Sequence, residues 1–382
     1  MNLPVELSIE DNLRINVLLN QNLHALRIDD SKMIIYGLSE KGEAVVKLNP
    51  NCRDEQYIKK VKELISSHVL GSPGGYPVYL RRWTRMGQAK EDSLERLLQL
   101  GEPEAVVAVV HANGISNEIA RRAWWCMPNS VNARCMLESP DVVSGDMGRV
   151  LAEFLLEFLP FEEEPRDIVN SVRLVLQENL ITAEERDGIW KKGQRKNAFL
   201  VGFLHTIPDD IEGSISPHPL YEQCLKMFSD NNSIAAQTVL RVLSPGGQLF
   251  LNTVLTVMKK PANQDVVIEL LKAVSSYFSP LVAGTDLASL SVSDNLEEVK
   301  TRTTQALLSD DDVIHDIRDY IQRNEDLAKR FYAMLYLAQL GEKTANPVFS
   351  RTDAIGTVMR KKLEPVFELI LEQLHVLYAG KQ

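Results

Sequence analysis

An apolar periodicity of helical type runs through nearly all of the chain after residue 92, and it constrains the fold more than any other feature. Leu94, Leu97 and Leu98 are spaced to share one helix face, as are Leu151 and Phe154. Such a face is stable only when it packs against another element. Breaks that combine glycine, proline or an acidic residue separate the periodic segments. We therefore expect a set of packed helices over this region.

A short sequence pattern occurs twice in the helical part. Leucine, proline, an acidic residue and valine recur 37 positions apart, at Leu100, Pro103, Glu104 and Val106 and then at Leu137, Pro140, Asp141 and Val143. A period of about 40 residues is typical of solenoids built from stacked helix pairs. A bundle with proline at its helix starts gives the same pattern. We predict a HEAT-like α-solenoid, with an irregular helical bundle as the alternative.

The beginning of the chain has a mixed pattern. A helical segment with Leu13, Val17 and Leu18 on one face precedes three strand-like runs, and residues 53–69 return to helical spacing. The strand-like runs cover residues 23–28, 33–38 and 44–48, with a hairpin turn at 39–42, and a last strand is expected over 76–83. We predict a small α+β domain at residues 1–88, HEAT-like helical repeats at 89–260 and a C-terminal helical region at 261–382.

Composition narrows the class of protein. The formal net charge of −10 disfavours nonspecific binding of nucleic acid by the whole surface. No segment approaches the roughly 18 uninterrupted apolar residues of a membrane span. Glu6 and Glu10 lie where a signal peptide would be apolar. We expect a cytoplasmic protein whose four cysteines are free thiols.

The sequence carries no recognisable catalytic motif and no metal-binding spacing. Its seven histidines are scattered, and none has a histidine or cysteine three or four positions further on. The patterns of serine hydrolases and zinc peptidases are also missing. We predict that the chain is not an enzyme and that it uses no cofactor and no metal.

The best cationic cluster surrounds a tryptophan near the end of the predicted N-terminal domain, at Arg81, Arg82, Trp83 and Arg85. Guanidinium groups beside an aromatic ring can hold a phosphate, a nucleotide or an acidic protein surface. The alternative is a linker whose arginines pair with surplus carboxylates. The glycine-rich loop at residues 71–76 lies beside the cluster, but it fits no phosphate-binding motif, and we expect a plain turn from helix to strand.

A second candidate site combines cations, tryptophans and thiols, at Arg121, Arg122, Trp124, Trp125, Cys126 and Cys135. A cysteine near arginines can have a lowered pKa and act as a thiolate acceptor or sulfur carrier. Arg121 and Arg122 are expected to point away from the apolar face, and Arg122 alone is spaced to share a face with Cys126. The alternative is that the tryptophans and a small thiol fill the interface between helices.

Three strings of the sequence resemble the DsrS family, which is associated with the dissimilatory sulfite reductase system of sulfur-oxidising bacteria. The strings are Leu48–Tyr57, His68–Gly87 and Ala120–Trp125, within a similar stretch from Ile28 to Pro160. The resemblance implies a cytoplasmic accessory protein tied to the oxidation of stored sulfur, with a regulatory role. It implies no active site, so no catalytic residue is carried over.

These observations favour a non-catalytic accessory or regulatory protein of the sulfur-oxidation (Dsr) system that acts by protein–protein interaction. Its expected partner is a protein of that system and not a membrane, while nucleic acid is a disfavoured partner that stays open. Two alternatives stay open: a sulfur-transfer protein that uses Cys126 or Cys135, and an RNA-binding post-transcriptional regulator that uses Arg81, Arg82 and Arg85. The sequence gives no prediction of the oligomeric state.

Overall fold

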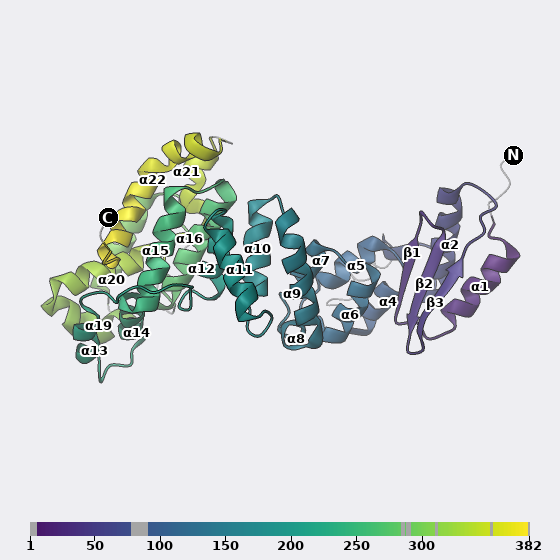
Figure 1. Ribbon diagram of the computed structural model, residues 1–382, viewed down its shortest axis with the longest axis horizontal. Helices are drawn as coiled ribbons and strands as arrows, with labels where there is room; N and C mark the ends of the chain where they lie inside the picture. Colours follow the sequence, from purple (N-terminus) through teal and green to yellow (C-terminus); the bar gives the residue numbers. More distant parts are fainter. Residues whose placement is uncertain are drawn as a thin grey trace. The chain divides into compact units, whose positions relative to one another are not determined.

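The computed structural model describes residues 6–77, 91–283, 287, 292–309, 312–351 and 354–380 (Figure 1). Contacts between Cα atoms divide the chain into two compact units, Met1–Phe158 and Leu159–Gln382. The chain is mostly helical, and a three-stranded antiparallel sheet lies near its N-terminus. This confirms the predicted mostly α class with an N-terminal α+β region. The domain limits at residues 88 and 260 stay predictions.

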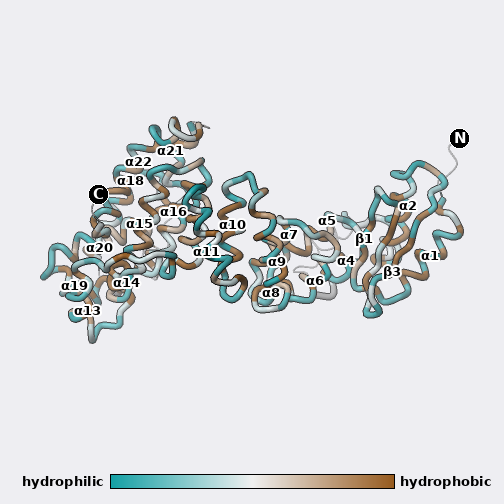
Figure 2. The backbone as a smooth tube through the Cα atoms, in the orientation of Figure 1, coloured by the Kyte–Doolittle hydropathy of each residue, from teal (hydrophilic) through white to brown (hydrophobic). Residues whose placement is uncertain are grey.

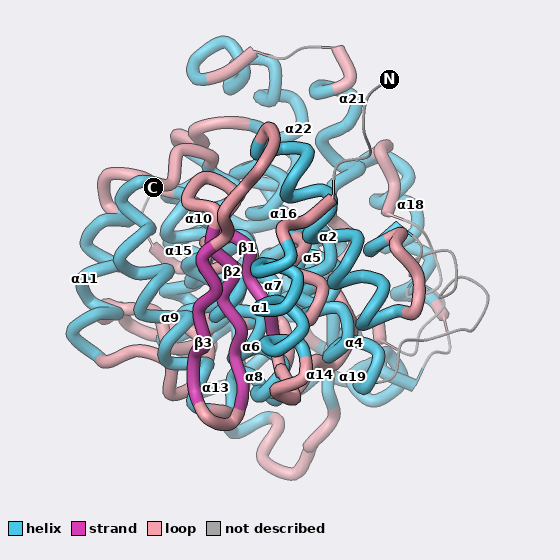
Figure 3. Tube along the Cα trace, turned by 90° about the vertical axis from the view of Figure 1, so that its right-hand side faces the viewer, coloured by secondary structure: helices cyan, strands magenta, loops and turns pink. Residues whose placement is uncertain are grey.

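The first unit begins with a helix, a sheet and a second helix. These are α1 (Ile9–Leu19), β1 (Ala25–Asp29), β2 (Ile34–Ser39), β3 (Gly42–Lys47) and α2 (Asp54–Leu70). The strands lie side by side in the order β1-β2-β3 (Figure 3). Ser39 pairs with Gly42 across the β2–β3 turn, where Gly42 has a φ of +105°. All three predicted strands, the hairpin and the helix over residues 53–69 are thus confirmed.

One apolar core holds α1, the sheet and α2 together. Ile15 and Leu18 of α1 are buried with Leu26 of β1, Ile35 of β2 and Tyr57 of α2. Successive residues of a strand face opposite sides, so alternate strand positions reach this core. The burial in β2 follows that alternation.

The predicted apolar face of α1 is wrong in part. Leu13 and Val17 are 65% and 55% exposed, whereas Leu18 is buried at 2%. The buried face of α1 consists instead of Asp11, Ile15, Leu18 and Leu19. Apolar residues lie on both sides of this helix, and spacing alone does not tell which side meets the sheet.

Short helices complete the first unit: α4 (Glu91–Leu98), α5 (Pro103–Val110), α6 (Asn117–Cys126), α7 (Ser130–Met136), α8 (Pro140–Ser144) and α9 (Asp146–Phe158). Their starts follow local rules, since Pro103 and Pro140 occupy the first helical turn, where no backbone donor is needed. The side chains of Ser116 and Asn129 cap α6 and α7. Helices α4 and α6 contact β1, so the helices and the sheet belong to one unit.

The strand expected at residues 76–83 is wrong where the structure describes it. Residues 75–77 are helical, and residues 78–83 lie outside the described residues. Tyr76 and Pro77 follow a glycine-rich stretch, which gave the segment the appearance of a strand entering from a turn. The loop at residues 71–74 therefore leads into helical residues.

All regular elements of the second unit are helices within its described residues. Its elements are η1 (Leu159–Phe161), α10 (Pro165–Val175), α11 (Ala183–Gly193), α12 (Ala198–Thr206), α13 (Tyr221–Met227), α14 (Ile234–Leu243), α15 (Pro245–Lys259), α16 (Gln264–Phe278), η2 (Ser279–Leu281), α18 (Leu296–Leu308), α19 (Asp312–Arg323), α20 (Glu325–Leu337), η3 (Glu342–Ala345), α21 (Asn346–Phe349) and α22 (Gly356–Leu377). The helices predicted near residues 266–278, 312–323, 327–340 and 362–378 are all present.

Large aromatic side chains fill the core of the second unit. Phe203, Phe250, Phe278 and Phe331 are each 0% exposed. Hydrophobic positions recur along α15 and α16, the helices that carry Phe250 and Phe278 (Figure 2). Gly202 lets α12 pack closely against α10, because a Cβ at this position would lie only 2.5 Å from Val172 Cγ1 of α10.

Candidate functional site

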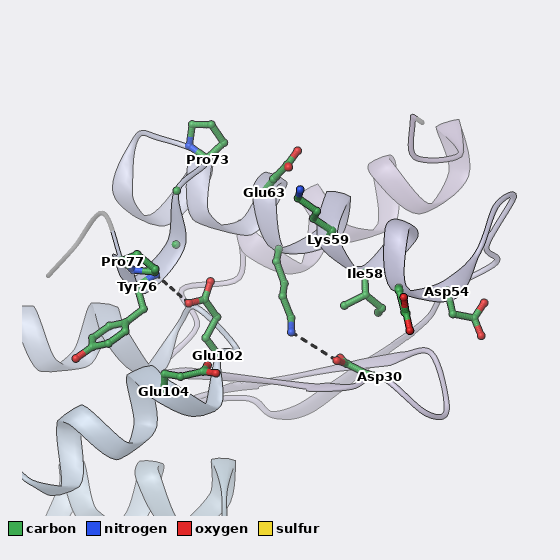
Figure 4. Close-up of a pocket in the computed structure, with 14 residues that line it drawn as sticks. Asp30, Asp54, Ile58, Lys59, Glu63, Pro73, Tyr76, Pro77, Glu102 and Glu104 are labelled. Atoms are coloured by element: carbon green, nitrogen blue, oxygen red, sulfur yellow. Dashed lines mark hydrogen bonds and ion pairs between the residues drawn. The ribbon is translucent and has the colours of Figure 1, made fainter. Parts of the chain in front are cut away.

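A pocket with a volume of about 650 Å³ lies in the first unit, where four segments meet. Asp30 comes from the β1–β2 turn, and Asp54, Ile58 and Lys62 come from α2. The glycine-rich loop and the helical residues that follow it contribute residues 73–77, and the start of α5 contributes Glu102 and Glu104. Figure 4 shows Asp54, Ile58 and Glu63 along α2, with Glu102 near Tyr76 across from them. The pocket therefore brings together the glycine-rich loop and the start of α5, which are separated in the sequence.

The glycine-rich loop is folded back by a single serine. Helix α2 ends at Gly71, whose φ of +69° gives the left-handed cap. Ser66 of α2 donates its hydroxyl to the Ser72 carbonyl at 2.7 Å and accepts the Gly75 N–H at 2.7 Å. Ser66 is 1% exposed, so these two bonds satisfy a buried hydroxyl. They fix where the loop leaves α2 and thus one wall of the pocket.

Two glycines let the loop and the α4–α5 turn approach each other and the sheet. Gly75 has a φ of +58°, and a Cβ there would lie 2.2 Å from Glu102 Oε1. Gly101 has a φ of +70°, and a Cβ there would lie 2.7 Å from Leu26 Cδ2 of β1. Side-chain-bearing residues rarely adopt this conformation, and a Cβ at either position would force the Glu102 or Leu26 side chain to move. Glycine is needed at both positions for the pocket to have this shape.

Two backbone N–H groups at the end of the glycine-rich stretch bond to protein side chains. Gly75 N–H bonds to Ser66, and Tyr76 N–H donates to Glu102 Oε2 at 2.9 Å. A phosphate cradle needs such N–H groups free to face the ligand. Here the Glu102 carboxylate accepts the Tyr76 N–H, where a bound phosphate would otherwise accept it. These two N–H groups are therefore not free to face a phosphate.

The charge of the lining is mainly negative. Six carboxylates face two lysines, at Asp30, Asp54, Glu55, Glu63, Glu102 and Glu104 against Lys59 and Lys62. Lys62 is neutralised by Asp30 at 3.5 Å, and Glu63 pairs with Lys60 outside the pocket at 2.7 Å. Within the described residues Asp54, Glu55 and Glu104 form no ion pair. The pocket therefore suits a cationic group.

Local helix chemistry explains why these three carboxylates are where they are. Asp54 and Glu55 stand in the first turn of α2, and Glu104 stands in the first turn of α5. The positive end of the helix macrodipole favours acidic side chains there, by about 0.3–1 kcal/mol each. The first turns of α2 and α5 lie at the same pocket. Because each helix start favours acidic side chains, the two together give the pocket a negative surface.

A second hollow of about 490 Å³ adjoins the pocket, because both are lined by Asp30 and Glu102. Arg27 of β1 lies in its wall together with Tyr36, Cys126 and Met127. The two hollows give the acidic pocket an extension along β1 and the start of α5.

Trp125 is part of the contact between the sheet and α6. The Arg27 guanidinium lies over the Tyr36 ring at 4.6 Å and over the Trp125 ring at 4.9 Å. Trp125 Nε1 donates to Glu43 of β3 at 3.0 Å. Trp124 packs edge to face against Phe154 of α9, with ring centroids 4.8 Å apart. Both tryptophans therefore make contacts inside the unit, as the interface interpretation expects.

The two arginines before the tryptophans form ion pairs. Arg121 donates to Glu118 at 3.1 Å and to Asp146 at 2.8 Å. Arg122 donates to Glu95 at 2.6 Å and to Glu118 at 3.0 Å. The Arg122 side chain is only 11% exposed, so the expectation that it points away from the packed face is wrong. It reaches α4 because Glu95 offers a carboxylate at that interface.

The predicted thiols differ in their surroundings. Cys126 is 8% exposed, and its Sγ lies 3.7 Å from the Leu26 carbonyl of β1. Burial raises the pKa of Cys126 to about 12, although the Arg27 charge opposes the shift. This is the reverse of the lowering that a resting thiolate needs. Cys135 is half-buried on α7, and burial raises its pKa as well.

Four predicted site residues, Arg81, Arg82, Trp83 and Arg85, lie outside the described residues. In the ranges that the structure describes, no group of three or more histidine, cysteine or acidic residues is arranged to hold a metal ion. None of the described helices combines the length and the hydropathy needed to cross a membrane.

Comparison of the chain with protein-family models, curated proteins and solved structures gives no match. The function of the candidate site therefore has to be inferred from the geometry of the site alone. Sequence reasoning identified the glycine-rich loop and the Gly101–Pro103 break separately, but it did not join them. No sequence pattern marked Asp30 or Lys62 as a site residue, because their role in the pocket comes only from the ion pair between them.

Proposed function

We propose that this chain is a non-catalytic accessory protein that binds another protein, and that its acidic pocket receives a basic segment of that partner. The carboxylates of Asp54, Glu55 and Glu104, which form no ion pair within the described residues, carry this proposal. A lysine- or arginine-rich segment supplies the missing cations and gains charge-assisted hydrogen bonds. The adjoining hollow gives room for the rest of an extended segment.

The walls of the pocket support selective binding. Ser66, Gly75 and Glu102 hold the loop in one arrangement, so little order has to be gained on binding. Lys62 is held by Asp30, which leaves Lys59 as the pocket lysine without an ion pair in the described residues. An acidic partner would meet like charge, so the site also discriminates against it.

The test is binding of a fluorescent lysine- and arginine-rich peptide to the full-length protein, followed by anisotropy. We expect binding that weakens as salt is added, because the contacts are electrostatic. The double variant Glu55→Gln with Glu104→Gln should weaken binding about tenfold, a loss of roughly 1.4 kcal/mol. An acidic peptide of the same length should not bind.

A matched control removes two equivalent charges from the second unit. Glu184 and Glu222 are exposed and also stand in the first turns of helices, α11 and α13. Glu184→Gln with Glu222→Gln changes the net charge equally and should leave binding unchanged. If both double variants weaken binding by the same factor, the effect belongs to the overall charge and the pocket proposal fails.

The finer description of the helices and the pathway are proposals as well. The proline-initiated helices α5 and α8, which carry the repeated pattern, support a HEAT-like arrangement in this part of the chain. The resemblance to the DsrS family supports a role in dissimilatory sulfur oxidation in the cytoplasm, with a protein of that system as partner. Co-purification with such a protein, lost in the Glu55→Gln and Glu104→Gln variant, would support both points.

The two alternatives keep their own tests. Sulfur transfer through Cys126 or Cys135 predicts a persulfide on one of them after incubation with a sulfur donor. RNA binding through Arg81, Arg82 and Arg85 predicts salt-sensitive binding that Arg81→Ala with Arg82→Ala abolishes. The acidic lining of the described pocket favours protein binding over both.

A further inference from the structure

Helices α5 and α7 bring a thiol and an imidazole together on the surface of the first unit. Cys135 Sγ lies 3.3 Å from His111 Nε2, although the two residues are 24 positions apart. His111 is the C-terminal cap of α5, and Cys135 lies in the last turn of α7. His111 is exposed and Cys135 is half-buried, so small molecules in solution can reach the pair.

The other nitrogen of the imidazole sets which atom faces the thiol. His111 Nδ1 lies 2.8 Å from the Val107 carbonyl oxygen, which can only accept a hydrogen bond. Nδ1 therefore carries the hydrogen, and in the neutral ring Nε2 offers its lone pair toward Cys135. A nucleophile, a base within hydrogen-bond reach and a third group that orients the base make up the usual arrangement of an activated thiol.

The partial burial of Cys135 makes a neighbouring base necessary for its reaction. Burial raises the pKa of the Cys135 thiol, with a smaller opposing effect of Arg134. The thiol is therefore protonated at rest, and a base has to accept its proton as it reacts.

We propose that Cys135 and His111 form a reactive thiol site that hydroperoxides oxidise to a sulfenic acid. The sulfur attacks one peroxide oxygen, so an S–O bond forms while the O–O bond breaks. The thiol proton passes to His111 Nε2 and then to the departing oxygen, which leaves as water from hydrogen peroxide or as an alcohol from an organic hydroperoxide. Sulfur is oxidised by two electrons and the peroxide is reduced. This site is independent of the acidic pocket and goes beyond the proposed binding function.

The protein contains its own reference thiols. Cys52 is half-buried like Cys135, but its sulfur lies 3.6 Å from the Arg53 carbonyl, and within the described residues no hydrogen bond joins it to an imidazole. Cys126 and Cys224 are buried. Treating the full chain with hydrogen peroxide and trapping sulfenic acid with dimedone therefore gives four rates in one sample by peptide mass spectrometry.

We expect Cys135 to be labelled faster than Cys52 in the unchanged protein. His111→Gln should slow the labelling of Cys135 by at least about tenfold, since a positioned base contributes on the order of a hundredfold or more. The labelling of Cys52 should not change. As a control, His375→Gln removes another exposed histidine from the second unit and should leave the Cys135 rate as it is.

Two results would overturn the proposal. One is a Cys135 rate no higher than that of Cys52, which needs no variant and so does not depend on how His111→Gln folds. The other is an unchanged Cys135 rate in His111→Gln with normal hydrogen exchange in α5 and α7. In that case the His111–Cys135 contact only helps to join the two helices.

Discussion

The two units of the chain use their charged residues differently. In the second unit Arg241 and Glu269 lie among packed helices, where Arg241 stacks at 3.9 Å on Tyr277 and Glu269 contacts His205 at 3.4 Å. In the first unit the carboxylates of α2 and α5 line an open pocket, and several form no ion pair within the described residues. Charges that are already satisfied hold helices together, whereas unpaired ones are available to a ligand.

This contrast predicts where substitutions act. Changes in the second unit should reduce its stability, and changes in the pocket of the first unit should alter binding more than folding. Because two units need not unfold in one step, stability is best followed by denaturant titration together with hydrogen exchange of peptides from each unit.

The largest expected effect comes from Gly247→Ala at the start of α15. A Cβ at Gly247 would lie 2.2 Å from the Arg241 carbonyl and 2.5 Å from the Val242 carbonyl, and these are backbone atoms that cannot rotate away. We expect a loss of about 3 kcal/mol in the free energy of unfolding, with faster exchange in α14 to α16. In the control Gly188→Ala on α11 the new Cβ meets open space, and stability should be unchanged or higher by about 0.5 kcal/mol. Equal losses in both variants would contradict this account.

Arg241→Lys should have the next largest effect. Arg241 pairs with Asp209 at 2.7 Å, donates to the Tyr277 carbonyl at 3.1 Å and stacks on the Tyr277 ring. A lysine cannot reproduce the planar stack together with both sets of bonds, and we expect a loss of about 2 kcal/mol. In the first unit Arg121→Lys alters an ion pair whose arginine is 45% exposed and should cost less than about 0.5 kcal/mol. Similar losses at both sites would remove the contrast between the units.

Glu269→Gln should change how the second unit responds to acid. Burial raises the pKa of Glu269, but the neighbouring His205 imidazole and the hydrogen bond from Lys272 outweigh it and hold the pKa at about 2, below its ordinary value of 4.5. The charged carboxylate therefore stabilises the fold above pH 4.5, and this contribution is lost as the pH falls toward 2. We expect the variant to be less stable by about 1.5 kcal/mol at neutral pH, after allowance for solvent screening.

The measurement is denaturant unfolding of both proteins from pH 7 to pH 2.5. The difference between wild type and Glu269→Gln should shrink as the pH falls through this range. A difference that stays constant would show that the Glu269 charge makes no net contribution, and that only the shape of the side chain matters.

Gly75→Ala should give the smallest change in stability and the clearest change in the pocket. The residue has a φ of +58°, and a Cβ would displace the Glu102 carboxylate, which is a flexible side chain that can move. Gly71→Ala has nearly the same φ, +69°, but meets nothing within 4 Å. Both variants should lose about 1 kcal/mol through backbone strain. Only Gly75→Ala should weaken binding of the basic peptide, and an equal effect of both on binding would contradict the role of the Gly75–Glu102 contact.

Local patterns in the sequence were enough to place many elements. The Ser39–Gly42 hairpin, helix α2 and the later helices α16, α19 and α20 follow from alternation, helical spacing and turn residues. The segment after Gly75 was misassigned, because a tyrosine and a proline after glycines look the same before a strand or a helical turn. The orientation of α1 was wrong for a related reason, since its apolar residues lie on two sides.

The candidate site was predictable only in fragments. The glycine-rich loop and the Gly101–Pro103 break were visible as separate features, and the thiol of Cys135 was noted without its histidine. His111 is 24 residues from Cys135, and Asp30 is 32 residues from Lys62, so no spacing rule joins either pair. Each pair exists because two elements pack together, and the sequence does not state which elements do so.

By itself, the sequence determined what depends on neighbouring residues: the helical character, the sheet hairpin, the helix caps and the acidic first turns of α2 and α5. These features follow from backbone hydrogen bonding and dipoles that act within a few residues. Only the tertiary structure decided that Glu102 meets the glycine-rich loop, that Arg122 is buried and that His111 faces Cys135. Those contacts arise when apolar faces pack, and packing brings together residues that are distant along the chain.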